Sequence, residues 1–399
     1  MHLVVLDPYA IPGPTPSAIQ SLQNADALAV AGAQVTLITP RPEQSFHAEN
    51  VLGRSLHARV NVIHLPDLRR RWFFPFRSNR LFFRQAAEVV TSLGADALYV
   101  RNLKLAGYLL ARQDMPPMFF ETHEIFSQSF IESHNSEHWT QRRKLRALEN
   151  LEGRVYRKAR GVVSITATLR DDIRQRFGMV APDHIAPDGV DMVLAAKANV
   201  TPSSTGLKKR EPIFLYLGSL HPWKGVPVLI KAMREVHRGR LLIAGGTAIR
   251  VAELADLCRE LGVEDRVELL GSIPPLSRFE LIASVDICLL PSSASSIGAR
   301  YTSPLKLFEY LAMGKAVIAA DLPALREVLH DGENARLVPV ENPSAMASAM
   351  NELVSSPTLT AALGKVAAHD AQQYSWRSRA ERLLAWMGSQ LEENHDDIV

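Results

Sequence analysis

The stretch DICLLPSSASSIGARYTSPLKLFEYLAMGKAVIAAD, residues 286–321, decides the fold of this chain. Its apolar run over 287–290 predicts a buried parallel strand. A Ser-rich loop follows, and Ser303 as N-cap with Pro304 at the first helical position predicts a helix that stops near Gly314. A second apolar strand comes next. We therefore expect a βαβ unit, whose helix N-terminus offers free N–H groups to an anion.

Two charged residues of this helix do not suit a role in packing. Lys306 lies in the first turn, where the helix dipole disfavours a cation, and Glu309 lies among apolar residues. One interpretation is a surface ion pair at i,i+3, which contributes little to stability. The other is a ligand site, in which phosphates meet the helix N-terminus and Lys306 while Glu309 accepts hydrogen bonds from hydroxyl groups.

Short apolar runs recur along the whole chain and alternate with helical patterns. This alternation is typical of an α/β fold with doubly wound parallel sheets. In the first half we expect strands over 2–6, 35–39, 97–100, 117–121 and 161–165. In the second half we expect strands over 213–217, 240–244, 266–270, 287–290, 316–319 and 335–338.

A glycine bend follows the strand expected over 213–217 and reads GSLHPWKG, residues 218–225. It brings Gly218, Ser219 and Lys224 ahead of the next helix, an arrangement that handles phosphate groups. The GxxxxGK[ST] pattern of a P-loop is absent, which argues against an ATPase of that class.

Other strand ends carry residues that suit a ligand. Gly245 and Gly246 end one strand and allow the backbone to approach a nucleotide closely. Gly13 lies in a Pro-rich loop after the first strand, at the edge where open α/β sheets bind ligands. That loop can also be a simple stiff connection. A GxGxxG fingerprint is absent, which argues against a dinucleotide-dependent dehydrogenase.

His123 stands at the end of the strand expected over 117–121, where its side chain can donate a hydrogen bond, act as a base or bind a metal. A structural histidine is the alternative on these residues alone. No HExxH pattern or paired Cys and His spacing surrounds it, which argues against zinc.

The segment LRRRWFFPFRSNRLFFR, residues 68–84, combines arginines with aromatic residues and contains no acidic residue. Such a composition suits an anionic membrane surface or an anionic acceptor. Stacking on single-stranded nucleic acid would use the same chemistry, but no RRM or OB pattern accompanies it. Aromatic core residues with solvated arginines are the remaining alternative. The patch in question comprises Arg69, Arg70, Arg71, Trp72, Arg77 and Arg80.

The composition bounds the class of protein. At 399 residues, with 47% hydrophobic and 22% charged residues, the chain can form two domains with sizeable cores. Its two cysteines predict a reducing compartment and no disulfide framework. The net charge of +3 does not indicate nucleic acid. No signal peptide or membrane-spanning run is recognised, so we expect a cytoplasmic protein, peripheral on the inner membrane face if the basic segment binds lipid.

The segment SPLKLFEYLAMGKAV resembles the donor-binding signature of family 4 glycosyltransferases, which have the GT-B fold. In that family two glutamates with seven residues between them bracket the strand-to-helix turn, and the second binds the nucleotide ribose. Glu309 matches the second glutamate, whereas Tyr301 stands at the first position. The contact to the transferred sugar is therefore left to Tyr301, Ser303 or backbone groups.

Further segments resemble the same family. GSLHPWKG is similar to its Gly-Arg-Leu-x3-Lys-Gly segment, whose Arg and Lys neutralise the donor diphosphate. Lys224 matches the Lys, but Ser219 occupies the Arg position, so Lys306 is the natural replacement. The resemblance implies a donor site composed of Gly218, Ser219, Lys224, Gly245, Gly246, Ser272, Ile273, Tyr301, Ser303, Leu305, Lys306 and Glu309.

The first half resembles the acceptor-side domain of that family. ETHE, residues 121–124, is similar to the family's Glu-x-His-Asp/Glu motif, whose His lies beside the sugar at the reaction centre. The acceptor side would contain Gly13, His123 and Glu124, and the reaction would depend on His123, Lys224 and Glu309. The resemblance also implies a domain of 1–195, a linker of 196–211, a domain of 212–373 and a final helix, 374–399, that packs back onto the first domain.

The resemblance implies two doubly wound domains facing across a cleft, and transfer of a sugar with retention of configuration. The donor would be a UDP-, GDP- or dTDP-sugar, and the acceptor a hydroxyl of a glycan or lipid-linked molecule, as in cell-surface polysaccharide or glycolipid synthesis. Neither a cofactor nor an essential metal is expected. Two alternatives remain: another chemistry on this fold, such as a sugar-nucleotide epimerase or a phosphorylase, or a silent scaffold that binds nucleotide-sugar or membrane.

Overall fold

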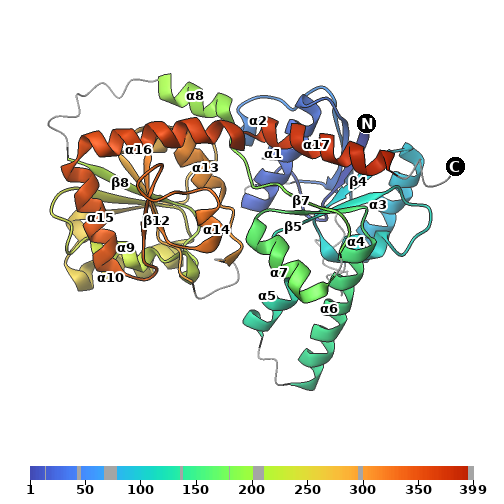
Figure 1. The fold of residues 1–399 in the computed structure, drawn as a ribbon, viewed down its shortest axis with the longest axis horizontal. Helices are drawn as coiled ribbons and strands as arrows, with labels where there is room; N and C mark the ends of the chain where they lie inside the picture. Colours follow the sequence, from blue (N-terminus) through green and yellow to red (C-terminus); the bar gives the residue numbers. More distant parts are fainter. Residues whose placement is uncertain are drawn as a thin grey trace. The chain divides into compact units, whose positions relative to one another are not determined.

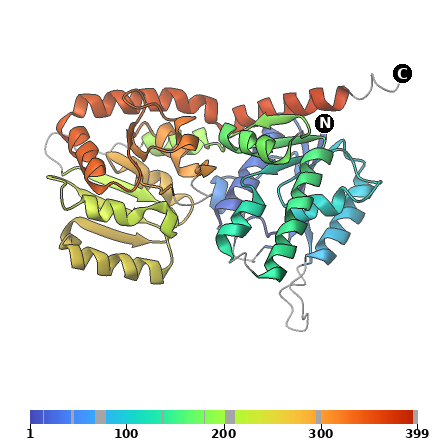
Figure 2. The same ribbon diagram turned by 60° about the horizontal axis from the view of Figure 1, so that its bottom comes forward.

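The computed structural model of the chain describes residues 1–13, 15–42, 46–66, 79–134, 138–178, 180–200, 211–294 and 300–393. These residues form two compact units, Met1–Pro187 with Trp376–Val399 and Asp188–Ser375. Each unit contains one parallel sheet covered by helices, as Figures 1 and 2 show. This arrangement confirms the α/β class predicted from the sequence.

The sheet of the first unit has the strand order β3-β2-β1-β4-β5-β6-β7, and every pair of neighbouring strands is parallel. Because parallel strands all end at one edge, the loops after β1 and β5 emerge on the same side of the sheet. The strands are β1 His2–Leu6, β2 Gln34–Pro40, β3 Val60–Leu65, β4 Ala97–Val100, β5 Met118–Thr122, β6 Gly161–Ser164 and β7 Asp183–Ile185.

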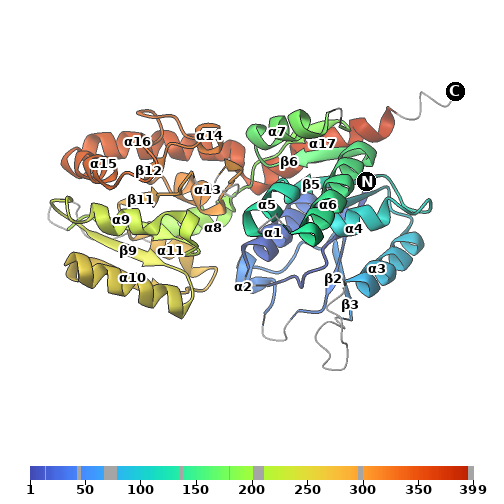
Figure 3. The same ribbon diagram turned by 90° about the horizontal axis from the view of Figure 1, so that it is seen from below.

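The helices of the first unit cover its sheet, and Figure 3 shows them from below. Four of them begin with a side-chain cap: Thr15 for α1, Asn102 for α4, His138 for α6 and Thr166 for α7. The helices are α1 Pro16–Val30, α2 Glu49–Leu52, α3 Arg80–Leu93, α4 Leu103–Leu109, α5 Phe126–Ser133, α6 Trp139–Lys158, α7 Ala167–Phe177 and α17 Trp376–Glu392.

The sheet of the second unit has the order β10-β9-β8-β11-β12-β13 and is also parallel throughout. Its strands β11 and β12 are the two apolar runs of the stretch 286–321 that decided the fold prediction. The strands are β8 Ile213–Leu217, β9 Arg240–Ala244, β10 Val267–Gly271, β11 Ile287–Leu290, β12 Ala316–Ala320 and β13 Arg336–Val338.

These strands are apolar along their whole length because both faces of the sheet are covered. Leu215 and Cys288 point into a core shared with α11 and α13, whereas Tyr216 and Leu289 point into a core shared with α9, α10 and α15. Successive side chains of a strand alternate between faces, so a doubly covered strand needs a hydrophobic residue at every position. The helices are α8 Met192–Val200, α9 Val226–Ala232, α10 Ala248–Leu261, α11 Ser277–Ala283, α13 Leu305–Ala312, α14 Pro323–Arg326, α15 Pro343–Ser355 and α16 Pro357–Asp370.

The division of the chain differs from the expected boundaries. The first unit ends at Pro187 instead of residue 195, and residues 192–200, partly assigned to a linker, form helix α8. Its Ala195 is buried in the same core as α11 and α13, which assigns α8 to the second unit. An Ala- and Val-rich segment can be a helix or a linker by composition, and the apolar contact decides between them.

The last helix, α17, belongs to the first unit and is held there by a buried arginine. Arg379 is 1% exposed and donates to the carbonyl oxygens of Pro187 (3.0 Å) and Ala186 (3.3 Å). It also donates to Asn24 Oδ1 (2.5 Å) and Glu121 Oε2 (3.0 Å). The guanidinium thus links α17 to α1, β5 and the segment that closes the unit.

A second contact of α17 depends on a glycine in β6. A Cβ built on Gly161 would lie 2.5 Å from Cη2 of Trp386, so only glycine leaves room for the indole. The indole contacts Phe119 edge-on, with ring centroids 5.4 Å apart, and stacks on His184 at 5.1 Å. Aromatic pairs at such distances stabilise the packing of α17 across β5 to β7.

Within the described residues, no helix is long and apolar enough to cross a membrane.

Arg379→Met should strongly destabilise the first unit. The change leaves the Glu121 carboxylate buried without its cation, and removing one partner of a buried ion pair costs about 3–5 kcal/mol. Urea denaturation followed by circular dichroism measures the loss. Arg377→Met on the same helix is the matched control, because Arg377 is exposed and forms an exposed ion pair with Glu381, so we expect a change below about 0.5 kcal/mol. Equal stability of the two variants would contradict the role given to Arg379.

Candidate functional site

Glycines form the carboxyl edge of the second sheet and bring three strand ends into contact. Gly218 follows β8, and Gly245 follows β9 and donates from its N–H to the carbonyl oxygen of Gly271 at 2.6 Å. A Cβ built on Gly245 would lie 2.1 Å from the carbonyl oxygen of Gly218, and one on Gly246 would lie 2.3 Å from Leu220. Side chains are therefore excluded here, and the edge presents bare backbone to a ligand.

Lys224 is held next to this edge by a tight turn. It ends the 3-10 turn Pro222–Lys224, just before α9, and thus lies ahead of the helix as the glycine bend predicted. Gly225 has φ 71°, and a Cβ there would lie 2.0 Å from the carbonyl oxygen of Pro291, so the turn packs directly on the chain that follows β11. The N–H of Ser293 donates to the carbonyl oxygen of Trp223 at 2.9 Å. Lys224 Nζ lies 3.6 Å from the centroid of the Trp223 ring.

Lys306 approaches the same edge from α13. Its side chain is buried, and its Nζ lies 3.7 Å from the centroid of the Tyr216 ring. A Cβ built on Gly218 would lie 3.2 Å from that Nζ, so the amine stands directly against the glycine at the end of β8. A cation in the first turn of a helix, unfavourable on dipole grounds, is thus aimed at the bare backbone edge.

Neither lysine has an ion pair or a hydrogen bond within the part of the chain that the structure describes. Burial lowers the pKa of Lys306 below its usual range, and the charge of Lys224 lowers it further, against a smaller opposite effect of Glu309. Burial lowers the pKa of Lys224 to about 8. A buried amine beside a second, half-buried one is costly, and an anion bound between the two would reduce that cost.

Glu309, on the same helix, is buried and has a partner that the sequence did not reveal. Its Oε1 accepts a hydrogen bond from Nε of Arg278 at 2.5 Å, and both residues are less than a tenth exposed. The interpretation of Lys306 and Glu309 as an exposed surface pair is therefore wrong, because both side chains are buried. Nη2 of Arg278 is buried and has no hydrogen-bond partner within the described residues.

The start of α13 differs from the predicted cap. The helix begins at Leu305 with Pro304 as its cap residue and without a side-chain hydrogen bond. Ser303 Oγ instead accepts a hydrogen bond from the N–H of Asp188 at 3.0 Å, so its prediction as N-cap is wrong. The first N–H groups of α13 consequently have no side-chain cap and can serve an anion.

The remaining residues of the implied donor site vary in exposure. Tyr301, at the position of the missing glutamate, is 1% exposed and belongs to the core. Leu305 is half-buried, Ser272 is exposed, and Ile273 packs against the core shared with α11 and α13. The carbonyl oxygen of Ser219 accepts a hydrogen bond from the Tyr216 hydroxyl at 2.7 Å. The bend is thus fixed by its neighbours, whereas the position of Ser272 is open to solvent.

In the first unit, His123 lies at the carboxyl end of β5 and is oriented by Glu121. The distance from His123 Nε2 to Glu121 Oε1 is 2.5 Å, and the imidazole is about one quarter exposed. Because a carboxylate only accepts, Nε2 carries the proton, and Nδ1 is the ring nitrogen that can accept a hydrogen bond from a substrate.

Glu121 is fully buried and is the centre of a polar network. Its Oε1 accepts from Gln20 Nε2 at 2.9 Å and lies 3.6 Å from Nε of Arg101, and its Oε2 accepts from the Tyr99 hydroxyl and Arg379. Burial raises the pKa of Glu121, but the charge of Arg379 and the hydrogen bond from His123 outweigh it, so that the pKa lies well below its usual range. The carboxylate therefore stays ionised and holds His123 in one orientation.

Two other predicted residues lie at this edge of the first unit. A Cβ built on Gly13 would lie 3.0 Å from the carbonyl oxygen of Ala10 and 3.1 Å from Cβ of Ala18, so glycine lets the loop after β1 pack tightly against α1. Glu124 accepts a hydrogen bond from the Ser129 hydroxyl in α5. Both loops are thereby fixed beside the ends of β1 and β5.

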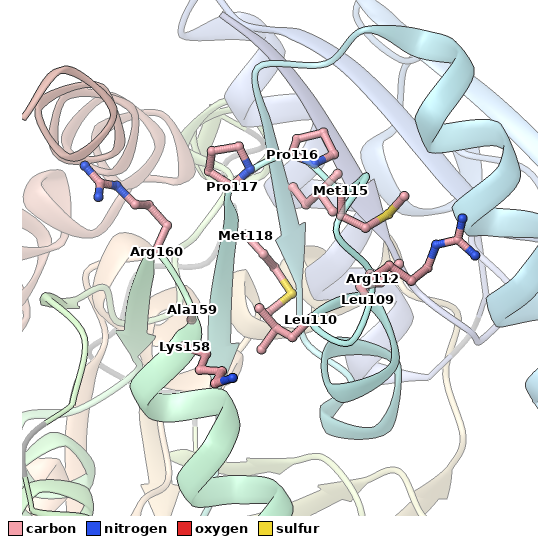
Figure 4. A pocket seen from close by; sticks show the side chains of 11 residues that line it. Leu109, Leu110, Arg112, Met115, Pro116, Pro117, Met118, Lys158, Ala159 and Arg160 are labelled. Carbon is pink, nitrogen blue, oxygen red and sulfur yellow. The ribbon is translucent and has the colours of Figure 1, made fainter. Parts of the chain in front are cut away.

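The pocket in Figure 4 lies at the opposite edge of the same sheet. Leu98 near the start of β4 and Met118 at the start of β5 line it, and its volume is about 320 Å³. Because His123 follows the carboxyl end of β5, this pocket is not part of the candidate site. Its other lining residues are Leu109, Leu110, Arg112, Met115, Pro116, Pro117, Lys158, Ala159 and Arg160.

Most of the predicted basic and aromatic patch lies outside the described residues: Arg69, Arg70, Arg71, Trp72 and Arg77. Arg80 is described and is the first residue of α3.

Sequence reasoning did not find the roles of the buried arginines Arg278 and Arg379 or of the half-buried Arg101. Each neutralises a buried carboxylate from a distant part of the chain, and a single Arg in a helix or loop carries no pattern that reveals such a partner. Among the described residues, no group of three His, Cys, Asp or Glu side chains could hold a metal ion.

Two protein-family models match the chain. The model described as Glycosyltransferase Family 4 matches residues 20–193, and the model described as Glycosyl transferases group 1 matches residues 211–356. Together they cover most of the chain, one in each half.

Curated relatives of the chain are glycosyltransferases. A D-inositol 3-phosphate glycosyltransferase of Nocardia farcinica is 29% identical over 252 residues, which are 58% of this chain and 53% of that protein. The enzyme of that name from Rhodococcus erythropolis is 31% identical over 192 residues, 46% of this chain and 42% of that protein. The chain thus matches about half the length of these relatives.

Solved structures share the fold of the chain. Sucrose-phosphate synthase of Thermosynechococcus elongatus superposes with a TM-score of 0.76 at 21% identity, covering 98% of this chain and 99% of that one. HepE of Anabaena, solved in complex with UDP, has a TM-score of 0.73 at 19% identity and covers 98% of this chain and 100% of that one. With one matching domain in each half and this fold, the chain belongs to the glycosyltransferases with the GT-B fold, as a member with a family 4 domain followed by a group 1 domain.

Proposed function

We propose that the protein transfers a sugar from a nucleotide-diphosphate sugar to a hydroxyl of a glycan or lipid-linked acceptor, with retention of configuration. The observation that carries the proposal is the buried amine of Lys306, which stands against the glycine at the end of β8, with the charge of the half-buried Lys224 close by. Such a pair requires an anion, and the diphosphate of a nucleotide-sugar supplies two adjacent charged groups.

The proposed donor assignment follows from the surroundings of each group. The diphosphate binds Lys224, Lys306 and the first N–H groups of α13. It approaches the protein backbone at the glycines that end β8 and β9. Glu309 binds the ribose hydroxyls with the oxygen that Arg278 does not engage. Arg278 then acts through Glu309 by fixing the position of its carboxylate.

The proposed chemistry is a front-face reaction assisted by the leaving group. As the sugar–phosphate bond breaks, negative charge develops on the diphosphate, where the two lysines and the dipole of α13 stabilise it. The acceptor hydroxyl attacks from the same face, and its proton passes to the departing phosphate oxygen. Retention then requires no pair of enzyme carboxylates of the kind that a double displacement uses.

The identity of the donor base stays a proposal. HepE, a structure of the same fold, was solved with UDP and with UDP-glucose, which favours UDP-sugars among the donors to be tested here. A thermal-shift screen against UDP-, GDP- and dTDP-sugars followed by a transfer assay tests the proposed function. Stabilisation by none of these donors would contradict it.

The proposed acceptor side contains His123, Glu124 and Gly13, with Nδ1 of His123 facing the sugar. We also propose that residues 69–84 hold a lipid-linked acceptor or an anionic membrane surface, which would make the protein peripheral on the cytoplasmic face. Charge reversal at Arg69, Arg70 and Arg71 should weaken its binding to anionic vesicles at low salt. Equal binding to neutral and anionic vesicles would remove this electrostatic role.

Two other functions are compatible with a nucleotide-sugar site. A sugar-nucleotide epimerase or a phosphorylase would bind the same groups, and donor turnover without an acceptor would favour the epimerase. Tyr301 and Ser219 stand where the family has a glutamate and an arginine. These two differences favour a silent scaffold, which would bind the donor without turnover.

Affinity for a nucleoside diphosphate should fall as the pH rises through about 8. The pKa of Lys224 is lowered to about 8 in the free protein, and a bound diphosphate favours the protonated amine. Above that pH, binding must take up a proton, and affinity falls by up to about tenfold per pH unit. Isothermal titration between pH 7 and 9.5 measures this dependence. Lys224→Arg, which stays charged, is the control. A wild-type affinity that depends on pH as little as the affinity of Lys224→Arg would refute the assignment.

Glu309→Gln and Lys224→Ala should differ in their affinity for a nucleoside that carries no phosphate. Glu309→Gln removes charge-assisted hydrogen bonds to the ribose and should weaken binding of nucleoside and nucleotide about 10- to 100-fold. Lys224→Ala should weaken only the diphosphate, by a similar factor, and Lys231→Ala on α9 should change neither. Glu309→Gln also removes the carboxylate that pairs with Arg278 and can lower the melting temperature. Affinities are therefore measured well below the melting temperature of each variant. A lower melting temperature with unchanged nucleoside affinity would make Glu309 a purely structural partner.

His123→Ala should lower kcat while nucleotide affinity stays nearly unchanged. The side chain belongs to the first unit, whereas the proposed nucleotide-binding groups belong to the second, and loss of one hydrogen bond to the reacting sugar costs about tenfold or more in rate. Steady-state kinetics and titration with UDP measure the two effects. His134→Ala, an exposed histidine of α5, is the control. Full activity of His123→Ala would return this residue to a structural role.

A further inference from the structure

Helices α5 and α6 form a hairpin that projects from the body of the first unit (Figure 1). Helix α6 packs against α5, and its residues Leu145 and Leu148 are half-buried. Glu152 of α6 is fully buried and accepts hydrogen bonds from the N–H groups of Phe126 (2.6 Å) and Ser127 (3.0 Å). These contacts fix the rotation of α6 and therefore decide which residues it exposes.

The outer face of α6 is a stripe of exposed residues at helical spacing. Trp139, Arg143, Arg146, Asn150 and Arg154 follow one another three or four residues apart, and all are exposed. The stripe contains no acidic residue. Trp139 is 67% exposed, the second highest value among the exposed large hydrophobic residues of the described chain.

The acidic residues of α6 do not neutralise this stripe. Glu149 pairs with Arg176 of α7 at 2.7 Å, and Glu152 is buried under the start of α5. Lys144 is exposed and adds a further cation beside the stripe. Within the described residues, no acidic side chain of α6 compensates the positive charge of this exposed face, which extends over about 22 Å of helix from Trp139 to Arg154 at 1.5 Å per residue.

We propose that this stripe of α6 is a docking surface for an anionic lipid bilayer. Cations arranged in a row on a straight helix can all reach one flat surface, and each attracts the anionic headgroups. An exposed indole next to them suits the headgroup level, where Trp residues concentrate. Ile131 of α5 is also exposed (41%) and adds an apolar group on the partner helix. Charge alone would serve a soluble polyanion, and the exposed Trp139 favours the bilayer.

The hairpin would place the bilayer near the candidate acceptor loop. Glu152 holds the first residues of α5, which directly follow His123, Glu124 and Ile125. Thirteen residues of helix, about 20 Å, separate Glu152 from Trp139. A docked α6 would thus present the loop of His123 to an acceptor that is anchored in the membrane. This consequence rests on the proposed function, whereas docking itself does not.

Vesicle co-sedimentation of the full chain tests the proposal. Vesicles of neutral phosphatidylcholine are compared with vesicles containing anionic phosphatidylglycerol, at low and high salt. One variant reverses the stripe with Arg143→Glu, Arg146→Glu and Arg154→Glu. The matched control reverses exposed cations of the second unit, Lys231→Glu, Arg234→Glu and Lys365→Glu, and so has the same net charge. Circular dichroism checks that both variants fold.

The expected result is binding to anionic vesicles only, reduced about 100-fold by the stripe variant and far less by the control. Tryptophan emission should shift to shorter wavelength on binding and be quenched by brominated lipid, and Trp139→Ala should reduce both signals, to which the five Trp residues of the chain can contribute. Tyr9→Ala, at another exposed aromatic residue, should not affect binding.

Three results would overturn the proposal. The stripe variant could bind like the control, or only the variant reversed at Arg69, Arg70 and Arg71 could lose binding. Alternatively, the wild-type chain could bind the soluble polyanion heparin while tryptophan emission shows no shift with vesicles. None of these readouts depends on sugar transfer, so the failure of this proposal and the failure of the proposed function can be told apart.

Discussion

A buried charge is costly unless it has a partner, and this constraint organises both units. In the first unit, the buried carboxylate of Glu121 is compensated by Arg379, which fastens the last helix of the chain onto a sheet formed far earlier in the sequence. In the second unit, Glu309 is compensated by Arg278. The same rule applied to Lys224 and Lys306 finds no compensating group within the described residues, and a bound anion is the natural remedy. The balance of buried charge thus distinguishes the parts that hold the fold from the part that awaits a ligand.

The two sheets prepare this arrangement by simple geometry. All strands of each sheet are parallel, so their carboxyl ends, and the loops that follow them, gather at one edge. In the second unit, glycines at the ends of β8 and β9 remove every side chain from that edge and admit the amine of Lys306. In the first unit, the edge carries His123, held by Glu121 in the orientation that turns Nδ1 outward. The chemistry proposed here needs both properties: close approach of backbone to phosphate and a fixed polar group beside the sugar.

The family assignment and the site agree on most positions and differ at two. Tyr301, where the family has its first glutamate, is packed in the core, so the hydroxyl groups of the transferred sugar must find other partners in this chain. Ser219 takes the place of an arginine, and the buried amine of Lys306 lies close to the same bend. A chain that lacks one cation and offers another nearby keeps the positive charge that a diphosphate needs, but places that charge differently.

The sequence by itself determined the strands, the class of fold and the identity of Lys224, Lys306 and Glu309 as unusual residues, because strands covered on both faces are apolar throughout and charges within apolar helices stand out. It did not indicate the edge strands β3 and β7, whose residues are mixed or few, or helix α8, whose composition equally suits a linker. Only the tertiary structure decided that Ser303 holds the turn at Asp188 and does not cap α13. Only it decided the partners Arg278 and Arg379, since contacts between residues distant in sequence leave no periodic trace in the chain, and burial, which makes them obligatory, is a property of the folded unit alone.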